Sequence, residues 1–225
     1  QIDLMHTLGI PYKIISKDDV DYSSKISICI EMAKSKNRPT ALLIKKGTFD
    51  KFNNETLVTK ENQMKREEAL EIILGNLDEN TIVVSTTGKT SREIFELRQK
   101  NDQTHKQDFL TVGSMGHCSS IALGIAMAKP NRNVVCIDGD GAMLMHLGSL
   151  TTIANLKLNN FRHILMNNEV HESVGGQKTA AQDINLSAVI NAMGTYKLFK
   201  AESPSELKLI TTDFLSCSGP SFLEV

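Results

Sequence analysis

The sequence predicts an α/β protein with a doubly wound, mostly parallel sheet that carries helices on both faces. Short apolar segments rich in Val and Ile alternate with segments of helical periodicity along most of the 225 residues. Parallel strands in this rhythm are joined by helical crossovers, which cover both faces of the sheet. A content of 40% hydrophobic and 23% charged residues is ordinary for a globular protein with such a core.

Residues 1–50 contain a strand–helix–strand pattern. We expect strands at residues 11–15 and 40–44, with a helix at residues 24–33 between them. A unit of this size is too small for an independent domain, so we expect it to be the end of a longer domain that begins upstream of Gln1. Polar residues without apolar periodicity follow from Gly47, and residues 51–65 are expected to be a linker.

Residues 66–225 are expected to form the main domain and to continue beyond Val225, inside a strand. The expected strands are residues 81–85, 109–112, 133–137, 162–166 and 221–225. The expected helices are residues 66–77, 91–97, 118–128, 142–156 and one that begins at Ser203. Thr90 and Glu93 fit a capping box for the helix at 91–97, and Pro204 suits the first turn of the last helix. Residues 172–183 show no clear pattern.

Charge and cysteine usage exclude several partner classes. The net charge of −1 gives no electrostatic footprint for nucleic acid, and no apolar run approaches the roughly 20 residues that span a bilayer. We therefore expect no nucleic acid and no membrane partner. The four cysteines are far apart and form no Cys-x-x-Cys pattern, so we expect reduced thiols and a cytoplasmic protein.

Polar residues follow two of the expected strands. The strand at 133–137 continues into Gly139-Asp140-Gly141, and the strand at 162–166 continues into Asn167-Asn168. Ligands of open α/β sheets bind at the carboxyl ends of strands, and carboxylate and amide oxygens suit Mg²⁺. Glycines let the backbone approach an anion at a helix N-terminus. Gly-Asp-Gly alone is more often a tight turn, but both strand ends together predict a metal-bridged diphosphate site.

Gly139-Asp140-Gly141, 25 further residues and Asn167-Asn168 together resemble the signature of thiamine diphosphate enzymes. The resemblance implies that the side chains of Asp140 and Asn168 and the main-chain carbonyl of Val170 bind Mg²⁺. Family members often have Gly or Thr near Val170, so the sequence Glu169-Val170-His171 departs from the family pattern.

Two more strand ends carry the same resemblance. Gly113-Ser114-Met115-Gly116 is similar to the Gly-x-Met segment of acetohydroxyacid synthase-like enzymes. This implies that the Gly113 carbonyl accepts a hydrogen bond from the cofactor's 4′-amino group and that Met115 supports its bent form, although Met115 alone would be interpreted as a core residue. Thr87-Gly88-Lys89 suits diphosphate oxygens, with a solvated turn as the alternative. The cofactor-binding residues implied are Thr87, Gly88, Lys89, Gly113, Ser114, Met115, Gly139, Asp140, Gly141, Ala142 and Asn168.

Segments 85–93, 112–117 and 171–179 resemble phosphonopyruvate decarboxylase and the sulfopyruvate decarboxylase β subunit, within a likeness that covers residues 66–225. Residues 1–50 then correspond to the end of a pyrimidine-binding domain, and residues 66–225 to the diphosphate-binding domain. Having both domains on one chain favours the first family, which converts 3-phosphonopyruvate to phosphonoacetaldehyde and CO₂ in phosphonate biosynthesis. The alternatives are a sulfopyruvate decarboxylase and an acetolactate synthase-like carboligase.

Other classes fit the sequence less well. The intact Asp140, Asn168 and Met115 disfavour a non-catalytic module, and no Gly-x-Gly-x-x-Gly follows a strand as a nicotinamide-binding domain requires.

The family resemblance also implies a homo-oligomer whose site is shared between chains, with an activating glutamate upstream of Gln1. Met115, His117 and His171 are the catalytic candidates, and the Gly175-Gly176 pair predicts a loop that closes over a 2-oxoacid substrate. Residues that offer a cation or donor to its second anionic group are Lys89, Arg92, His117, His171, Gln177 and Lys178. A single His or Lys in a loop is more often a solvated surface residue.

Overall fold

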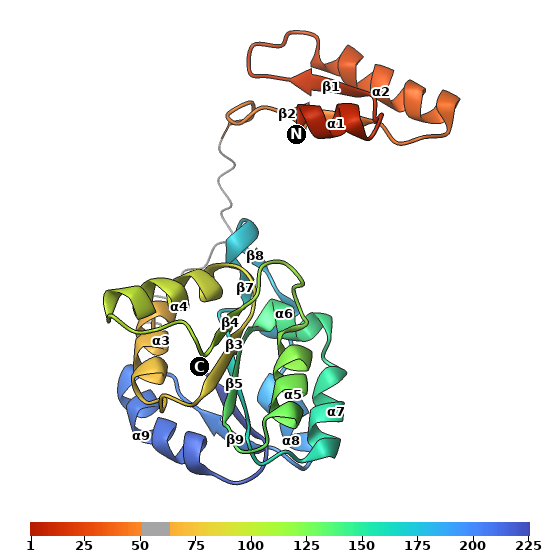
Figure 1. Ribbon diagram of the computed structural model, residues 1–225. Coiled ribbons are helices and arrows are strands. Elements are labelled where there is room, and N and C mark those ends of the chain that lie inside the picture. Colours follow the sequence, from red (N-terminus) through yellow and green to blue (C-terminus); the bar gives the residue numbers. More distant parts are fainter. Residues whose placement is uncertain (51–63) are drawn as a thin grey trace. The chain divides into compact units, whose positions relative to one another are not determined.

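The computed structural model describes residues 1–50 and 64–225, which form two compact units (Figure 1). Most of the expected linker at 51–65 lies outside the described residues. Within them, no helix is both long and apolar enough to cross a membrane.

The first unit pairs two parallel strands, β1 (Tyr12–Ile15) and β2 (Ala41–Ile44), as the sequence predicts. They are joined by α2 (Tyr22–Lys36), which extends further than expected and buries Cys29 against them. A short helix that the sequence did not predict, α1 (Ile2–Thr7), precedes β1. Lys25 of α2 donates to the Ile14 carbonyl at 2.9 Å and so ties the helix to the strand.

The second unit contains a six-stranded sheet in which every pair of neighbouring strands is parallel. The predicted doubly wound α/β fold is therefore confirmed. In order across the sheet, the strands are β4 (Asp108–Leu110), β3 (Ile82–Ser85), β5 (Val134–Gly139), β6 (Phe161–Met166), β10 (Ser221–Glu224) and β9 (Lys197–Lys200). The strand β9 was not predicted; it has only four residues and lies at the edge of the sheet.

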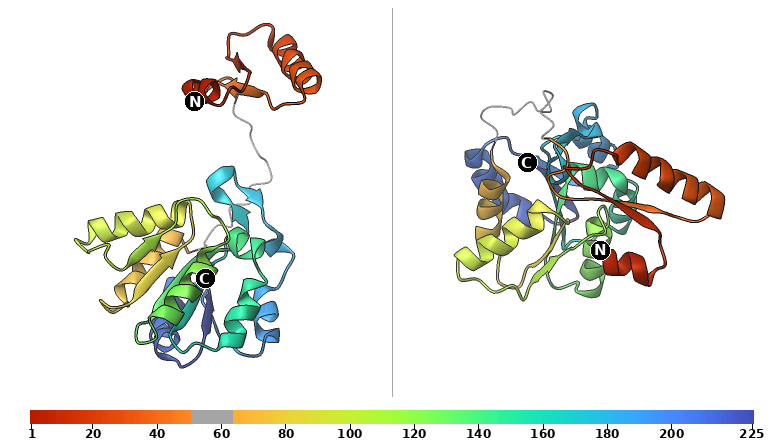
Figure 2. Two further views of the ribbon diagram at one scale, coloured as in Figure 1. Left: turned by 45° about the vertical axis from the view of Figure 1, so that its right-hand side comes forward. Right: turned by 90° about the horizontal axis from the view of Figure 1, so that it is seen from above.

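Helices cover both faces of this sheet, as Figures 1 and 2 show. One face carries α3 (Arg66–Gly75), α4 (Lys89–Lys100) and α9 (Pro204–Ser216). The other carries α5 (Cys118–Ala128), α6 (Asp140–Met145), α7 (Ser149–Leu156) and α8 (Leu186–Ala192). Alternate residues of each strand point to opposite faces, so Val135 and Ile137 join the first core while Val134 and Cys136 join the second.

The winding of the chain reverses between β3 and β5. From β3 the chain crosses through α4 to the edge strand β4, and then returns through α5 to the other side of β3. Because α4 follows β3 on one face and α6 follows β5 on the other, the carboxyl ends of β3 and β5 form the switch point of the sheet. This is where an open parallel sheet binds its ligands.

Two helix predictions were wrong. The segment 142–156 is two helices, because His146, Leu147 and Gly148 interrupt it and His146 leaves the helical conformation at φ −133°. The helix expected from Ser91 begins at Lys89, so Thr90 lies buried inside it and no capping box forms. Gly88 at φ +101° starts this helix instead, and the Ser91 hydroxyl donates to the Thr86 carbonyl at 2.7 Å.

The remaining boundaries agree with the sequence to within a few residues. Ser203 caps α9 by accepting from the Glu206 N–H at 3.3 Å, with Pro204 in its first turn, as predicted. The unassigned region after β6 contains a small antiparallel hairpin, β7 (Val170–His171) and β8 (Gln177–Lys178), and two 3₁₀ turns, η1 (Glu172–Val174) and η2 (Ala180–Gln182).

Candidate functional site

The predicted site residues lie at the carboxyl ends of four adjacent strands. Thr87-Gly88-Lys89 follows β3, Gly113-Ser114-Met115 follows β4, Asp140 follows β5 and Asn168 follows β6. The Gly113 N–H donates to the Thr87 hydroxyl at 2.9 Å, which joins the first two segments directly. Parallel pairing aligns Gly139 of β5 with Met166 of β6, so the residues that follow them emerge side by side.

Asp140 is the buried acid of this edge. Its side chain is 3% exposed, and its Oδ2 accepts a hydrogen bond from the Thr179 hydroxyl. Burial raises the pKa of Asp140, and the hydrogen bond from Thr179 opposes that shift. A carboxylate that loses hydration in this way is stabilised by a cation, which fits the predicted role as a Mg²⁺ ligand.

The two asparagines have different surroundings. Asn167 ties β6 to β10, because its Nδ2 donates to Glu224 Oε1 at 2.8 Å. Asn168 makes a local turn, in which its Oδ1 accepts from the Val170 N–H at 3.2 Å. Between them and the hairpin, Glu169 has a left-handed backbone at φ +61°. This bend turns the chain away from the sheet directly after Asn168, at the position predicted to bind metal.

The glycines test whether the site has room for a diphosphate. A Cβ built on Gly139 or on Gly113 would meet no atom within 4 Å, so open space adjoins both. A Cβ on Gly141 would lie 2.5 Å from Cε1 of His171, so only glycine lets that ring lie over the start of α6. Backbone bordered by open space, beside a buried acid, fits a bound anion and its metal.

Met115 lies half-buried just before α5, and His117 is the exposed N-cap residue of that helix. The His117 ring stands 4.5 Å, between centroids, from the ring of His146 at the end of α6. Sequence reasoning missed His146, although a histidine six residues after Asp140 was visible there. A Cβ on Gly116 would lie 2.5 Å from Nδ1 of His146, so this glycine permits the pairing of the two imidazoles.

The hairpin of β7 and β8 brings further polar residues to the site. His171 lies over Gly141, as its contact distances show, while Gln177 and Lys178 are exposed on β8. The turn uses Gly175 at φ +127° and Gly176 at φ +75°, conformations that favour glycine. Glu172, which the sequence did not single out, pairs with Lys89 at 2.5 Å and with Arg66 at 2.7 Å. Arg92 is exposed on α4, and its side chain makes no hydrogen bond or ion pair with another described residue.

Beneath the site lie polar groups that the sequence analysis did not identify. Burial raises the pKa of Asp138 to about 7 and lowers that of His163 to about 3. Nε2 of His163 is 3.8 Å from Asp138 Oδ2, too far for a hydrogen bond. The thiols of Cys118 and Cys136 lie 3.4 Å apart on the same face, and burial raises the pKa of both. These groups are neutral interior residues near pH 6.

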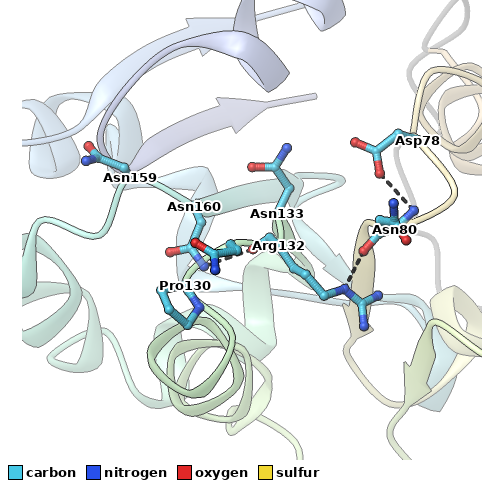
Figure 3. A pocket seen from close by; sticks show the side chains of 8 residues that line it. Asp78, Asn80, Pro130, Arg132, Asn133, Asn159 and Asn160 are labelled. Atoms are coloured by element: carbon cyan, nitrogen blue, oxygen red, sulfur yellow. Dashed lines mark hydrogen bonds between the residues drawn. The ribbon is translucent and has the colours of Figure 1, made fainter.

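Two hollows flank the sheet at opposite ends. One of about 730 Å³ adjoins Asn168 and the ends of β6, β9 and β10. The other, of about 390 Å³, lies where β3, β5 and β6 begin (Figure 3). There Arg132 Nε donates to the Asn80 carbonyl at 2.7 Å, and Asn160 Nδ2 donates to three carbonyls at 2.9–3.0 Å. Since these side chains hold strand starts together, this second hollow is structural.

Comparison with known proteins places residues 86–225 in the family described as "Thiamine pyrophosphate enzyme, C-terminal TPP binding domain". The chain is 40% identical over 157 residues to a phosphonopyruvate decarboxylase of Streptomyces hygroscopicus, a match that covers 70% of this chain and 38% of the relative. It is 40% identical over 162 residues to a sulfopyruvate decarboxylase subunit beta of Methanothermobacter thermautotrophicus, covering 72% and 81%. Acetolactate synthase isozyme 1 large subunit of Escherichia coli is 31% identical over 96 residues, covering 41% and 16%. The chain thus spans 38% of the length of the phosphonopyruvate decarboxylase it matches.

Proposed function

Because this chain belongs to the thiamine pyrophosphate enzymes, whose C-terminal TPP binding domain it carries, we propose that the whole protein is a 2-oxoacid decarboxylase that uses thiamine diphosphate and Mg²⁺. The observation that carries the proposal is the convergence of Asp140 and Asn168 at the ends of the adjacent strands β5 and β6. They lie at the carboxyl edge of the sheet, next to the point where its winding reverses, and open space adjoins Gly113 and Gly139 at the same edge.

In this proposal, the metal is held by the side chains of Asp140 and Asn168 and by the carbonyl of Val170. The diphosphate lies against the segments that follow β3 and β5, at Thr87, Gly88 and Lys89 and at Gly139, Gly141 and Ala142. When bound, thiamine diphosphate supplies the nucleophilic carbon and the electron sink that decarboxylation requires.

The protein contributes orientation and proton positions. The Gly113 carbonyl would accept a hydrogen bond from the cofactor's aminopyrimidine, beside Ser114, and Met115 would support the cofactor. His117 and His171 are the proposed catalytic residues of this chain, since an imidazole can donate or accept a proton and both residues follow strands at the carboxyl edge of the sheet. His146 joins them, because its ring adjoins that of His117.

The proposed substrate is 3-phosphonopyruvate, which yields phosphonoacetaldehyde and CO₂. It rests on the likeness to phosphonopyruvate decarboxylases and on the proposal that residues 1–50 are the end of a pyrimidine-binding domain, with residues 66–225 as the diphosphate-binding domain and 51–65 as a linker. Sulfopyruvate is the second candidate, favoured by a match that covers 81% of a sulfopyruvate decarboxylase β subunit. A carboligase like acetolactate synthase is the third.

Steady-state kinetics of the full-length protein with phosphonopyruvate, sulfopyruvate and pyruvate test the substrate. Charge-assisted hydrogen bonds to a phosphonate contribute about 1.5–3 kcal/mol each, so two of them favour phosphonopyruvate over pyruvate by about 100-fold or more in kcat/KM. Higher kcat/KM with sulfopyruvate would replace the first candidate by the second. If pyruvate is converted to acetolactate and neither phosphonopyruvate nor sulfopyruvate is decarboxylated, the first two substrate candidates are refuted. The cofactor assignment would remain intact.

A further inference from the structure

Glu172 is the junction of an ion-pair network beside the proposed anion site. Its Oε1 accepts from Lys89 Nζ at 2.5 Å, and its Oε2 accepts from Arg66 Nη1 at 2.7 Å. Arg66 also binds Glu93 with two hydrogen bonds of 2.7 Å each. The network therefore contains two cations and two carboxylates, which come from α3, α4 and the turn η1. The formal charge of the network is zero, so Lys89 carries no uncompensated charge in this state.

The network holds the β7–β8 hairpin against the start of α4. A Cβ on Gly88 would lie 2.9 Å from the Ser173 hydroxyl oxygen, so the residue after Glu172 lies directly over the segment that follows β3. On the other side of the hairpin, His171 lies over Gly141. The hairpin therefore contacts the segments after both β3 and β5, on either side of the point where the winding of the sheet reverses.

Lys89 is the first residue of α4, a helix whose N-terminal end has no capping side chain or acidic residue of its own. α4 spans twelve residues, and the structure shows neither a side-chain cap at Gly88 nor an acidic residue in its first turn. The first-turn N–H groups and the helix dipole there favour an anion. Glu172 supplies that negative charge here. Each of its carboxylate oxygens accepts a hydrogen bond from a different cation, Lys89 or Arg66.

We propose that Glu172 is a positioning residue that stays paired with Lys89 until a phosphate-type anion binds Lys89 instead. Arg66 then keeps its ion pair with Glu172 and so holds the hairpin over the site. This rests on the proposed function, because it treats Lys89 as part of the anion site. The two carboxylate oxygens bind different cations, so release of Lys89 leaves the contact with Arg66 intact. Glu172 thus sets how strongly the site binds an anion and discriminates against weak anions.

A double-mutant cycle of Glu172→Gln and Lys89→Met in the full-length protein tests this. Glutamine keeps the shape of Glu172 and removes its charge, so Mg²⁺-pyrophosphate and Mg²⁺-thiamine diphosphate should bind about threefold more tightly in calorimetry, as expected for a partly exposed ion pair. In the Lys89→Met background the same change should have no effect. Glu71→Gln is the matched control, because the pair of Glu71 with Lys100 joins the same two helices at 3.5 Å.

Two sources of the anion give different results. If Lys89 receives the cofactor, both affinities rise in Glu172→Gln. If it receives the substrate's second anionic group, those affinities stay constant, and the KM of phosphonopyruvate or sulfopyruvate falls by about threefold while that of pyruvate does not. The proposal is overturned if none of these quantities changes, or if the effect persists in Lys89→Met.

The calorimetric part needs no turnover, so it separates this proposal from the proposed function. If the protein decarboxylates no 2-oxoacid but Glu172→Gln still tightens pyrophosphate binding only when Lys89 is present, the proposed function is refuted and the role of Glu172 is not. Amide hydrogen exchange in residues 170–178 adds a second readout. Arg66→Met should make exchange in this segment faster. Glu172→Gln with bound pyrophosphate should increase the exchange rate less than Arg66→Met does. Equal exchange in Arg66→Met and wild type would contradict the retaining role of Arg66.

Discussion

The contribution of His163, a fully buried histidine on β6, to the stability of the folded protein should fall at acid pH. Its ring lies 5.1 Å, between centroids, from Phe222 and 6.1 Å from Phe161. Among the described residues, neither ring nitrogen has a hydrogen-bond partner. Burial without a partner lowers its pKa to about 3, so the folded protein keeps this histidine neutral where an unfolded chain would protonate it.

The magnitude follows from proton linkage. Between pH 6.5 and about 3 the unfolded state binds one proton more at this position, so stability falls as the pH falls. One pKa unit corresponds to about 1.4 kcal/mol, and the loss from pH 7 to pH 5 is therefore about 2 kcal/mol. Asp138 acts in the opposite direction, because its raised pKa of about 7 makes the folded state bind the extra proton. The two slopes oppose each other in the wild type between about pH 4 and pH 6.5.

The variant His163→Leu isolates the histidine. Leucine has a similar volume and no polar atoms, so it removes two unpartnered nitrogens without leaving a cavity. Urea unfolding of the cofactor-free protein should show that the variant gains stability over the wild type by about 2 kcal/mol more at pH 5 than at pH 7. An equal difference at both values would show that folding does not lower the pKa of His163, and would refute the reasoning.

Two further predictions concern the cofactor and the assembly. Asp140→Ala should weaken Mg²⁺-dependent binding of thiamine diphosphate by at least about 100-fold, or about 2.7 kcal/mol, while circular dichroism shows an intact fold; unchanged affinity in calorimetry would contradict its role as a metal ligand. The full-length protein should be at least a dimer, because the proposed site is shared between chains; light scattering that finds a fully active monomer would contradict this.

The sequence alone determined the architecture and where to look for its chemistry. Apolar β-branched segments alternate with helical ones, and this local pattern predicts a parallel sheet whatever the rest of the chain does. Asp140 and Asn168 were identifiable because each directly follows a strand. In a parallel sheet all strands end at one edge, so residues 28 positions apart were predictable neighbours.

Boundaries of helices were less predictable, because they depend on competing contacts. Apolar residues recur at helical spacing over 142–156, so the pattern predicts one helix although the chain leaves the helical conformation at His146. That break places the His146 ring against His117, which belongs to another strand end. Likewise, Thr90 fits a capping box by spacing, but Gly88 has the positive φ that starts α4 two residues earlier.

Only the tertiary structure decided which charged groups pair with one another and which polar groups are buried without a partner. Glu172 lies 83 residues from Lys89 and 106 from Arg66, and no periodicity links such distant positions. His163 belongs to a strand whose two faces are both covered, so alternation of polar and apolar residues could not indicate its burial. The pKa of a side chain depends on the atoms that surround it after folding, and those atoms come from segments that the chain brings together only in three dimensions.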